Sequence, residues 1–480
     1  SRFGASSSDV IAALEPLLSD LTPRIRVHTA ASTLKLGAYS KALELLRDLA
    51  VNGDEESRIE ALSAMGTSQD AEAFDLITDQ LKDPSVAVRR AALSALSSMD
   101  AERSLPILIE GLRDVELKQT AAKAIGQVGG SAANAVFDAL SNPKLESGAL
   151  LALEFLPNPN PKWIETFARS AVGRAIHYDE LVRTLSGQNG RTELLAKLLH
   201  EKVNQQGLSA LQAIALIGDK ETIKVAIENL ESPSVDQRAN VLEALESIGE
   251  RFREIIRPLM KLWDETLPTP VTLSPAAALL AALTDSDEWL RTCAAFAASP
   301  HTELKPALEQ LIESDPDPFA REVAAASMNG DHSMDTLPTL PLMERILFFR
   351  RVPLFANLST ADLKQVAAIS EESTFVDKDE IALQGETGDT MYIIVSGEIQ
   401  VTALKGDGTS AELARRKAGE VVGEMAIISK EPRMASLVAL GDVRTLCIDQ
   451  KSFEGLLRER AEVSLAVMQV LCTRIKEMAK

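Results

Sequence analysis

Apolar side chains recur at intervals of three and four residues up to about residue 330, which is the spacing of an amphipathic helix. The stretch that begins at Asp83 shows it clearly, with Val88, Ala92 and Leu96 on one helical face. An acidic residue followed by a proline precedes that face, and this pair is a typical signal for the start of a helix. The pattern predicts a long all-helical region.

Similar stretches occur along the whole region. They share an N-capping residue and an apolar helical face, and they begin at Asp54, Asp83, Asp114, Asn142, Ser232, Asp285 and Asp315. Most of them also carry an arginine near the first turn, at Arg58, Arg89, Arg238, Arg291 and Arg321. One helical hairpin cannot bury its own apolar face, so the copies must stack. We expect the arginines to join neighbouring copies through aspartate rather than to bind a ligand.

The copies at Asp83–Leu96 and Ser232–Leu245 resemble HEAT repeats, the units of a family of α-solenoids. The other copies are weaker, and proline-containing stretches at 156–163 and 264–275 interrupt the series. A solenoid implies a long surface for a protein partner. A spacer that contacts no partner is the other interpretation, and the sequence does not choose between the two.

The period changes to two from Phe375, where apolar and polar residues alternate between Gly-containing turns. This pattern predicts a small antiparallel barrel or roll. Short helices precede it, one of them capped by Ser359 with Asp362 three residues on, and an amphipathic helix follows it. The chain is therefore predicted to be multidomain, with an all-α solenoid at 1–334, a linker at 335–341 and an α+β domain at 342–480.

Charge and composition exclude several kinds of function. The chain of 480 residues has 50 Lys and Arg against 70 Asp and Glu, a net charge of −20, which argues against nucleic-acid or anionic-membrane binding. Its 3 cysteines include no CxxC pair and its 5 histidines are scattered. We therefore predict a reducing intracellular compartment, no metal and no cofactor. No catalytic fingerprint of a known enzyme class is present, so we predict a non-enzymatic protein.

Glu424 and Arg433 flank the apolar run "MAII" near the carboxy end. Two charged residues around such a run either pair with each other or share a ligand that has both a hydroxyl and an anionic group. The residues alone leave both alternatives open.

The segments "VPLFANLS", "QGETGDTMYIIVSGEIQV" and "GEMAIISKEPRMAS" together resemble the cyclic-nucleotide-binding domain family over roughly 342–480. That family includes bacterial catabolite activators and regulatory subunits of cyclic-AMP-dependent kinase. The resemblance implies an α+β β-roll with flanking helices. It also implies that Glu424 accepts a hydrogen bond from the ribose 2′-hydroxyl and that Arg433 binds the cyclic phosphate. The run "MAII" would form a short helix, and the barrel turns would need Gly385, Gly388 and Gly397.

The ligand-binding set that this resemblance implies is Gly423, Glu424, Met425, Ala426, Arg433, Met434, Ala435 and Ser436. Two positions depart from the family pattern: Val422 replaces an aromatic residue, and Met434 replaces a small or hydroxylated one. A hydroxyl at the second position helps to hold guanine, so Met434 favours cyclic AMP over cyclic GMP as the ligand. Leu471, Thr473, Arg474 and Ile475 are candidates for a base lid, but the favoured role of the same helical stripe is core or the seam of a homodimer.

The leading hypothesis is a cyclic-nucleotide sensor that passes ligand binding from the roll to the solenoid, and so to a protein partner. The alternative is a scaffold whose degenerate roll binds no ligand. The order of the two domains also resembles fusion proteins that carry a nucleotide-carrier-like transport region (ADP/ATP translocase-like), which would place the chain on the cytoplasmic face of a membrane or in an organelle. Because the chain begins with Ser1, a preceding segment is left open, and membrane association is expected only if such a segment spans the bilayer.

Overall fold

The computed structural model describes residues 7–36, 39–67, 71–230, 245, 252–263, 272–299, 301–328, 339–404, 410–459, 463–465, 467–468 and 472. Contacts divide the chain into two units, Ser1–Ile176 with Asn204–Pro268 and His177–Val203 with Thr269–Lys480. This boundary lies inside the helical region and differs from the predicted linker at 335–341. The predicted domain limits stay predictions.

The first unit is entirely helical over its described residues. Its helices are α1 (Ser7–Leu14), α2 (Pro23–Lys35), α3 (Tyr39–Asn52), α4 (Glu55–Met65), α5 (Ala71–Asp79), α6 (Val86–Leu96), α7 (Ala101–Gly111), α8 (Lys118–Val128), α9 (Ala133–Ala139), α10 (Glu146–Leu153), α13 (Lys220–Leu230) and α15 (Arg253–Trp263). Two longer helices, α11 (Pro161–Leu185) and α12 (Gly190–Ala215), have residues in both units. Short 3₁₀ helices lie at Glu15–Ser19, Gln80–Lys82 and Gly129–Ala132. Small Ala and Leu side chains fill the core, as the low aromatic content requires.

Asp54 caps helix α4 as predicted, by accepting a hydrogen bond from Ser57 N at 2.9 Å, but the aspartates that begin some later repeats play a different part. The Asp83 carboxylate accepts a hydrogen bond from Ser85 N at 2.8 Å, and Ser85 Oγ then caps helix α6. Asp285 and Asp315 do the same for Asp287 and Asp317, at 2.7 and 2.8 Å. In these three repeats the spacing builds a turn first and a helix cap two residues later, because an Asp side chain readily bonds the amide two residues on.

The arginines join neighbouring repeats, as predicted. Arg58 Nε lies 3.2 Å from Asp83 Oδ2 of the next repeat, and Arg89 Nη2 bonds Glu116 Oε2 at 2.6 Å, a glutamate in place of the expected aspartate. Each arginine also donates to a carbonyl of the turn that precedes its own helix. The copy that begins at Ser232, with Arg238, lies outside the described residues.

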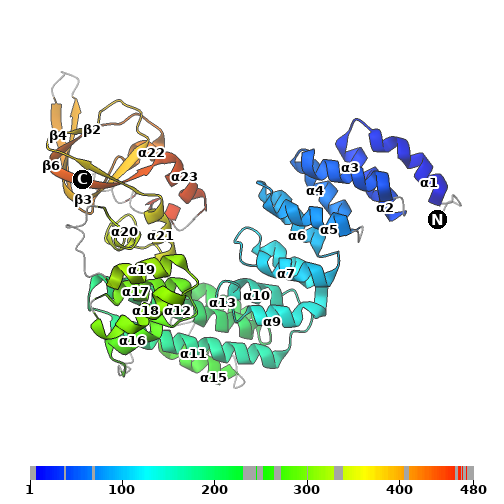
Figure 1. Ribbon diagram of the computed structural model, residues 1–480, viewed down its shortest axis with the longest axis horizontal. Helices are drawn as coiled ribbons and strands as arrows, with labels where there is room; N and C mark the ends of the chain where they lie inside the picture. The colour runs from blue at the N-terminus through cyan, green and yellow to red at the C-terminus, as the bar shows by residue number, and fades with distance from the viewer. Residues whose placement is uncertain are drawn as a thin grey trace. The chain divides into compact units, whose positions relative to one another are not determined.

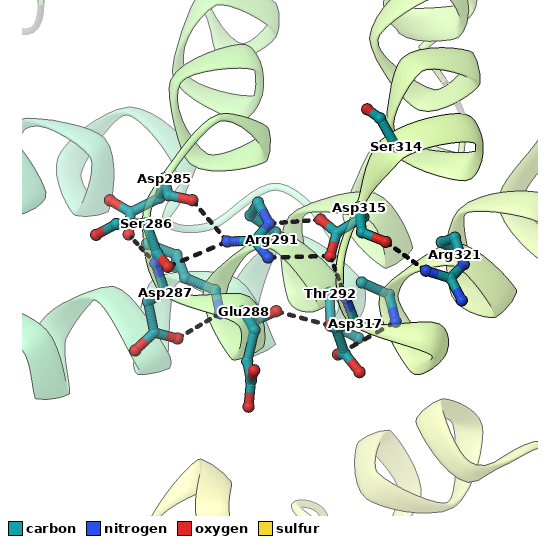
Figure 2. Close-up of polar contacts among 12 residues, drawn as sticks. Asp285, Ser286, Asp287, Glu288, Arg291, Thr292, Ser314, Asp315, Asp317 and Arg321 are labelled. Atoms are coloured by element: carbon teal, nitrogen blue, oxygen red, sulfur yellow. Dashed lines mark hydrogen bonds and ion pairs between the residues drawn. The ribbon is translucent and has the colours of Figure 1, made fainter. Parts of the chain in front are cut away.

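After residue 269 the second unit contains four more repeat helices, α16 (Pro275–Leu283), α17 (Glu288–Ala297), α18 (Lys305–Ser314) and α19 (Pro318–Met328), with a 3₁₀ helix at Thr302–Leu304. Figure 2 shows the arginine contact here: Arg291 bonds Asp315 of the next repeat through two nitrogens at 2.6 and 3.0 Å, and it donates a third bond to Asp285 O. Arg321 makes the equivalent backbone contact in the next repeat, because its guanidinium donates a hydrogen bond to Asp315 O. We call this series of contacts between an arginine and the next repeat the arginine ladder. It has a structural role in both units.

The remainder of the second unit is a roll with flanking helices, visible with yellow to red colours in Figure 1. Helices α20 (Leu342–Phe349) and α21 (Thr360–Ala368) precede the strands β1 (Glu371–Phe375), β2 (Glu380–Ala382), β3 (Thr390–Leu404), β4 (Ser410–Lys417), β5 (Val421–Val422) and β6 (Ser436–Asp449). All pairings are antiparallel in the order β1-β6-β3-β4, with β2 on β6 and β5 on β3. Helix α22 (Glu424–Ser429) lies against β3, and α23 (Gln450–Glu459) lies against β6.

The Ser359 cap of α21 is confirmed with a modified geometry. Ser359 Oγ accepts a hydrogen bond from Asp362 N at 3.1 Å and donates to Asp362 Oδ2 at 2.6 Å. A Glu or Gln at this position would reach back to the Ser backbone amide, whereas the shorter Asp side chain reaches the hydroxyl.

Candidate functional site

The segment that links β5 to β6 forms the candidate site, and both of these strands are held by β3. Val422 pairs with Tyr392 of β3, and Ser436 pairs with Thr402 of the same strand. The intervening residues leave the sheet, form α22 and return. The predicted short helix is therefore confirmed, and it contains "MAII" within Glu424–Ser429.

Gly423 stands at the left-handed N-cap of α22, with φ of 82°. A Cβ atom at this position would lie 2.6 Å from Arg433 Nη1, closer than any real Cβ contact. Glycine is therefore required at this position for two reasons: the left-handed backbone conformation and the close approach of the Arg433 guanidinium. Through this contact the predicted Gly423 and Arg433 are brought together.

The Arg433 guanidinium is buried, with the residue only 7% exposed. Its Nη2 donates to Thr390 O at 2.8 Å, and the guanidinium carbon lies 5.7 Å from the ring centroid of Tyr392. Burial raises the pKa of the Tyr392 hydroxyl, and the nearby Arg433 charge opposes that rise. Arg433 takes part in none of the ion pairs found among the described residues.

The loop 385–388 fixes the backbone of Arg433. Arg433 N donates to Glu386 O, and Gly385 N donates to Arg433 O, both at 2.8 Å. A Cβ on Gly388 would lie 2.7 Å from Ala426 Cβ and 3.0 Å from Arg433 Cγ. Gly388 therefore serves close packing around the arginine rather than a turn, whereas Gly385 and Gly397 have the positive φ expected of turn glycines.

Glu424 is the first residue of α22 and is 6% exposed, so the site contains a buried carboxylate as well as a buried guanidinium. A buried charge is costly unless a partner of opposite charge or a hydrogen-bonding group compensates it. A ligand with an anionic group offers a partner of opposite charge to the Arg433 guanidinium.

The other predicted residues surround this pair with different exposures. Ala426 is buried, whereas Met425 and Met434 are 41% and 60% exposed. Ala435 and Ser436 are half-buried, and Ser436 Oγ accepts a hydrogen bond from Gln384 N at 2.9 Å, which the sequence did not predict. The proposed lid residues Leu471, Thr473, Arg474 and Ile475 lie outside the described residues.

Two segments of the chain match protein-family models. Residues 372–460 match the cyclic nucleotide-binding domain, and residues 43–116 match HEAT repeats. Both resemblances drawn from the sequence motifs are thereby confirmed, and the matched domain contains both Glu424 and Arg433. The resemblance to a nucleotide-carrier fusion stays a prediction.

Curated relatives match about a quarter of the chain. Over 116 residues the chain is 28% identical to a cAMP-dependent protein kinase regulatory subunit of Blastocladiella emersonii, covering 24% of this chain and 29% of the relative. Over 120 residues it is 34% identical to cGMP-dependent protein kinase, isozyme 1, of Drosophila melanogaster, covering 24% of this chain and 16% of the relative. The matched part thus spans less than a third of either relative.

Solved structures with similarity include the regulatory domain of Toxoplasma gondii PKA with cAMP, at 27% identity, 28% coverage of this chain, 50% coverage of that chain and a TM-score of 0.26. The catabolite activator protein of Thermus thermophilus matches at 25% identity, with 26% coverage of this chain, 60% coverage of that chain and a TM-score of 0.26.

Within the part of the chain that the structure describes, none of the helices has both the length and the apolar character needed to cross a bilayer.

Proposed function

We propose that the carboxy-terminal domain of this chain binds a cyclic nucleotide, cyclic AMP in preference to cyclic GMP, and acts as a non-enzymatic sensor. The observation that carries the proposal is the buried guanidinium of Arg433. It is held by a carbonyl oxygen and an aromatic face and has no ion-pair partner among the described residues.

A cyclic phosphodiester is the anion that fits this arrangement. Its single negative charge would pair with Arg433 through charge-assisted hydrogen bonds, which are about twice as strong as neutral ones. Glu424 would accept a hydrogen bond from the ribose 2′-hydroxyl. The net charge of −20 repels a free anion from most of the surface, so binding depends on this one local cation.

The preference for cyclic AMP is a finer part of the proposal. Relatives named for cyclic AMP and for cyclic GMP are both similar to this chain, so they do not select a nucleotide. The apolar Met434, 60% exposed beside the site, offers no hydroxyl for a guanine edge. This absence supports cyclic AMP.

The role in regulation follows from where the roll is attached. Helix α20 of the roll contacts α12 within the second unit, through Arg191 with Glu344 at 2.7 Å and through Glu193 with Arg350, the residue after α20, at 3.2 Å. We infer that ligand binding shifts the equilibrium between conformations in which these contacts are formed and conformations in which they are broken. The helical repeats would transmit this shift to a protein partner. A membrane-transport region is one such partner, if it is joined to the repeats.

Calorimetric titration of the full chain with both nucleotides tests the proposal. Arg433→Ala should weaken cyclic AMP binding by about 2–4 kcal/mol, because charged hydrogen bonds contribute roughly 1.5–3 kcal/mol each. Arg415→Ala, which removes an exposed cation from β4, is the matched control and should leave the affinity unchanged. A dissociation constant that is unaltered by Arg433→Ala refutes the phosphate role. A wild-type chain that binds neither nucleotide leaves the scaffold interpretation in place.

A further inference from the structure

Helix α12 presents a row of charged side chains to the connection between α20 and α21. Glu193, Lys197 and Glu201 stand four residues apart and therefore share one helical face. We call the contacts of these three residues with Arg350 and with residues 356–360 the α12 seam. All of them lie in the second unit.

Lys197 holds two backbone carbonyls of the connection. Its Nζ donates to Ala356 O at 3.0 Å and to Leu358 O at 2.6 Å. Burial lowers the pKa of Lys197, and the nearby Glu201 opposes that effect. The lysine thus holds a turn of the chain through main-chain atoms, so the side chains of that turn have little influence on the contact.

Glu201 holds the first residue of α21. Its carboxylate accepts hydrogen bonds from Thr360 N at 3.0 Å and from Thr360 Oγ1 at 2.8 Å, and Thr360 is fully buried. Trp289 Nε1 of α17 donates to the same hydroxyl at 3.3 Å. Burial raises the pKa of Glu201, although the bonds from Thr360 lower it in part.

These contacts are well placed to open and close as one unit. Four hydrogen bonds from two side chains converge on residues 356–360, so a small displacement of this segment breaks them together. Burial disfavours the charged forms of both Lys197 and Glu201, and opening would return both charges to water. The seam is therefore less costly to open than its number of hydrogen bonds indicates.

Helix α20 and the residues just before it are also tied to the sheet of the roll. Arg345 of α20 donates to Ser370 O, next to β1, and Leu340 N donates to Glu372 Oε2 of β1 at 2.8 Å. Strand β1 pairs along its length with β6, the strand that begins at the candidate site. A movement of the roll around a ligand therefore displaces α20, α21 and the connection between them.

We propose that the α12 seam is a releasable latch that opposes cyclic-nucleotide binding in the roll. This inference rests on the proposed function and adds its regulation. Because coupling between two equilibria is reciprocal, a nucleotide that opens the seam must bind more tightly when the seam is already broken.

The test is calorimetric titration of the full chain with cyclic AMP, using Lys197→Met, Glu201→Gln and Thr360→Val. The first two substitutions each remove one charge of the seam. Thr360→Val removes only a hydroxyl, so it keeps the test valid if a variant that lacks a charge fails to fold. Lys202→Met is the matched control, because Lys202 pairs at 2.5 Å with Asp287, the N-cap residue of α17, and not with the connection. We expect each seam variant to bind about fivefold more tightly or better, within the usual range of allosteric coupling.

Hydrogen exchange supplies a second readout on the wild-type chain. Saturating cyclic AMP should speed exchange of the Thr360–Leu363 amides, which begin α21, while the β3 and β6 amides become slower. Folded seam variants with unchanged or weaker affinity, or slower exchange at Thr360–Leu363, overturn the latch while the proposed function stands. A wild-type chain that binds neither nucleotide overturns the proposed function itself and the latch with it, so the two failures are distinct.

Discussion

Arg433 and the glycine that faces it determine the candidate site at the scale of single residues. The guanidinium can approach the turn before α22 only because Gly423 has no Cβ. The same glycine has a positive φ, so a substitution there has two effects, backbone strain and a clash with the arginine. A second glycine in the roll, Gly441, has φ of 74° but open space around its Cβ position.

This pair of glycines gives a controlled experiment. Gly423→Ala and Gly441→Ala should each destabilise the protein by roughly 1–2 kcal/mol through left-handed strain. Only Gly423→Ala should also weaken cyclic AMP binding, by about tenfold or more, because it displaces Arg433. Chemical denaturation measures the first effect and calorimetry the second. Equal affinities of the two variants would show that the contact with Arg433 has no part in binding.

Met434 allows a test of nucleotide preference. Met434→Thr introduces a hydroxyl beside the site at a position that is already 60% exposed, so it should fold normally. We expect the ratio of cyclic GMP to cyclic AMP affinity to rise by about fivefold, the equivalent of one neutral hydrogen bond of roughly 1 kcal/mol. Competition between the two nucleotides measures the ratio. An unchanged ratio would remove Met434 from the account of selectivity.

At the scale of elements, the arginine ladder joins the repeats. Arg291 and Asp315 have side chains that are 12% and 3% exposed, in contrast to the surface pair Arg113 and Glu110 at 51% and 67%. Breaking a buried pair leaves one uncompensated charge, so Arg291→Gln should destabilise the second unit by about 3–5 kcal/mol. Arg113→Gln should change stability by about 1 kcal/mol at most. Urea denaturation followed by circular dichroism compares them, and similar losses would contradict the structural role.

The same pair predicts a pH dependence. Burial would raise the pKa of Asp315, but hydrogen bonds from Arg291 and from Asp317 N outweigh it, and the pKa is lowered overall. A carboxylate whose folded-state pKa is depressed stabilises the fold above its unfolded pKa, about 3.9, and this contribution is lost as the pH falls through the folded value. The difference in unfolding free energy between wild type and Arg291→Gln should therefore shrink below about pH 4. A difference that stays constant down to pH 2.5 would show that Arg291 acts by packing alone.

At the scale of the whole molecule, the two units should respond separately to a ligand. Cyclic AMP at 100 times its dissociation constant should stabilise the second unit by about 2.7 kcal/mol. Hydrogen exchange resolved by segment should slow in β3 and β6 and stay unchanged in α3 to α8 of the first unit. Arg433→Ala should abolish the response. A shift of equal size in both units would mean that they unfold as one cooperative body.

The sequence by itself determined the class of each element. A period of three to four residues with recurring arginines indicated stacked helices, and a period of two with Gly turns indicated a roll, because both patterns follow from local geometry. It also indicated Glu424 and Arg433, since their spacing matches a known motif. It placed the helix cap of the α6 repeat at Asp83 rather than Ser85, because both residues are of capping types and they lie only two positions apart.

Only the tertiary structure decided which distant residues meet. The contacts of Arg433 with Thr390, Tyr392 and the loop 385–388 join segments that are far apart in the chain. The α12 seam joins residues some 160 positions apart, such as Glu201 and Thr360. Local periodicity reports which face of an element is buried but carries no information on what covers that face. The packing of helices and sheet supplies that information, and with it the surroundings of the site and its proposed latch.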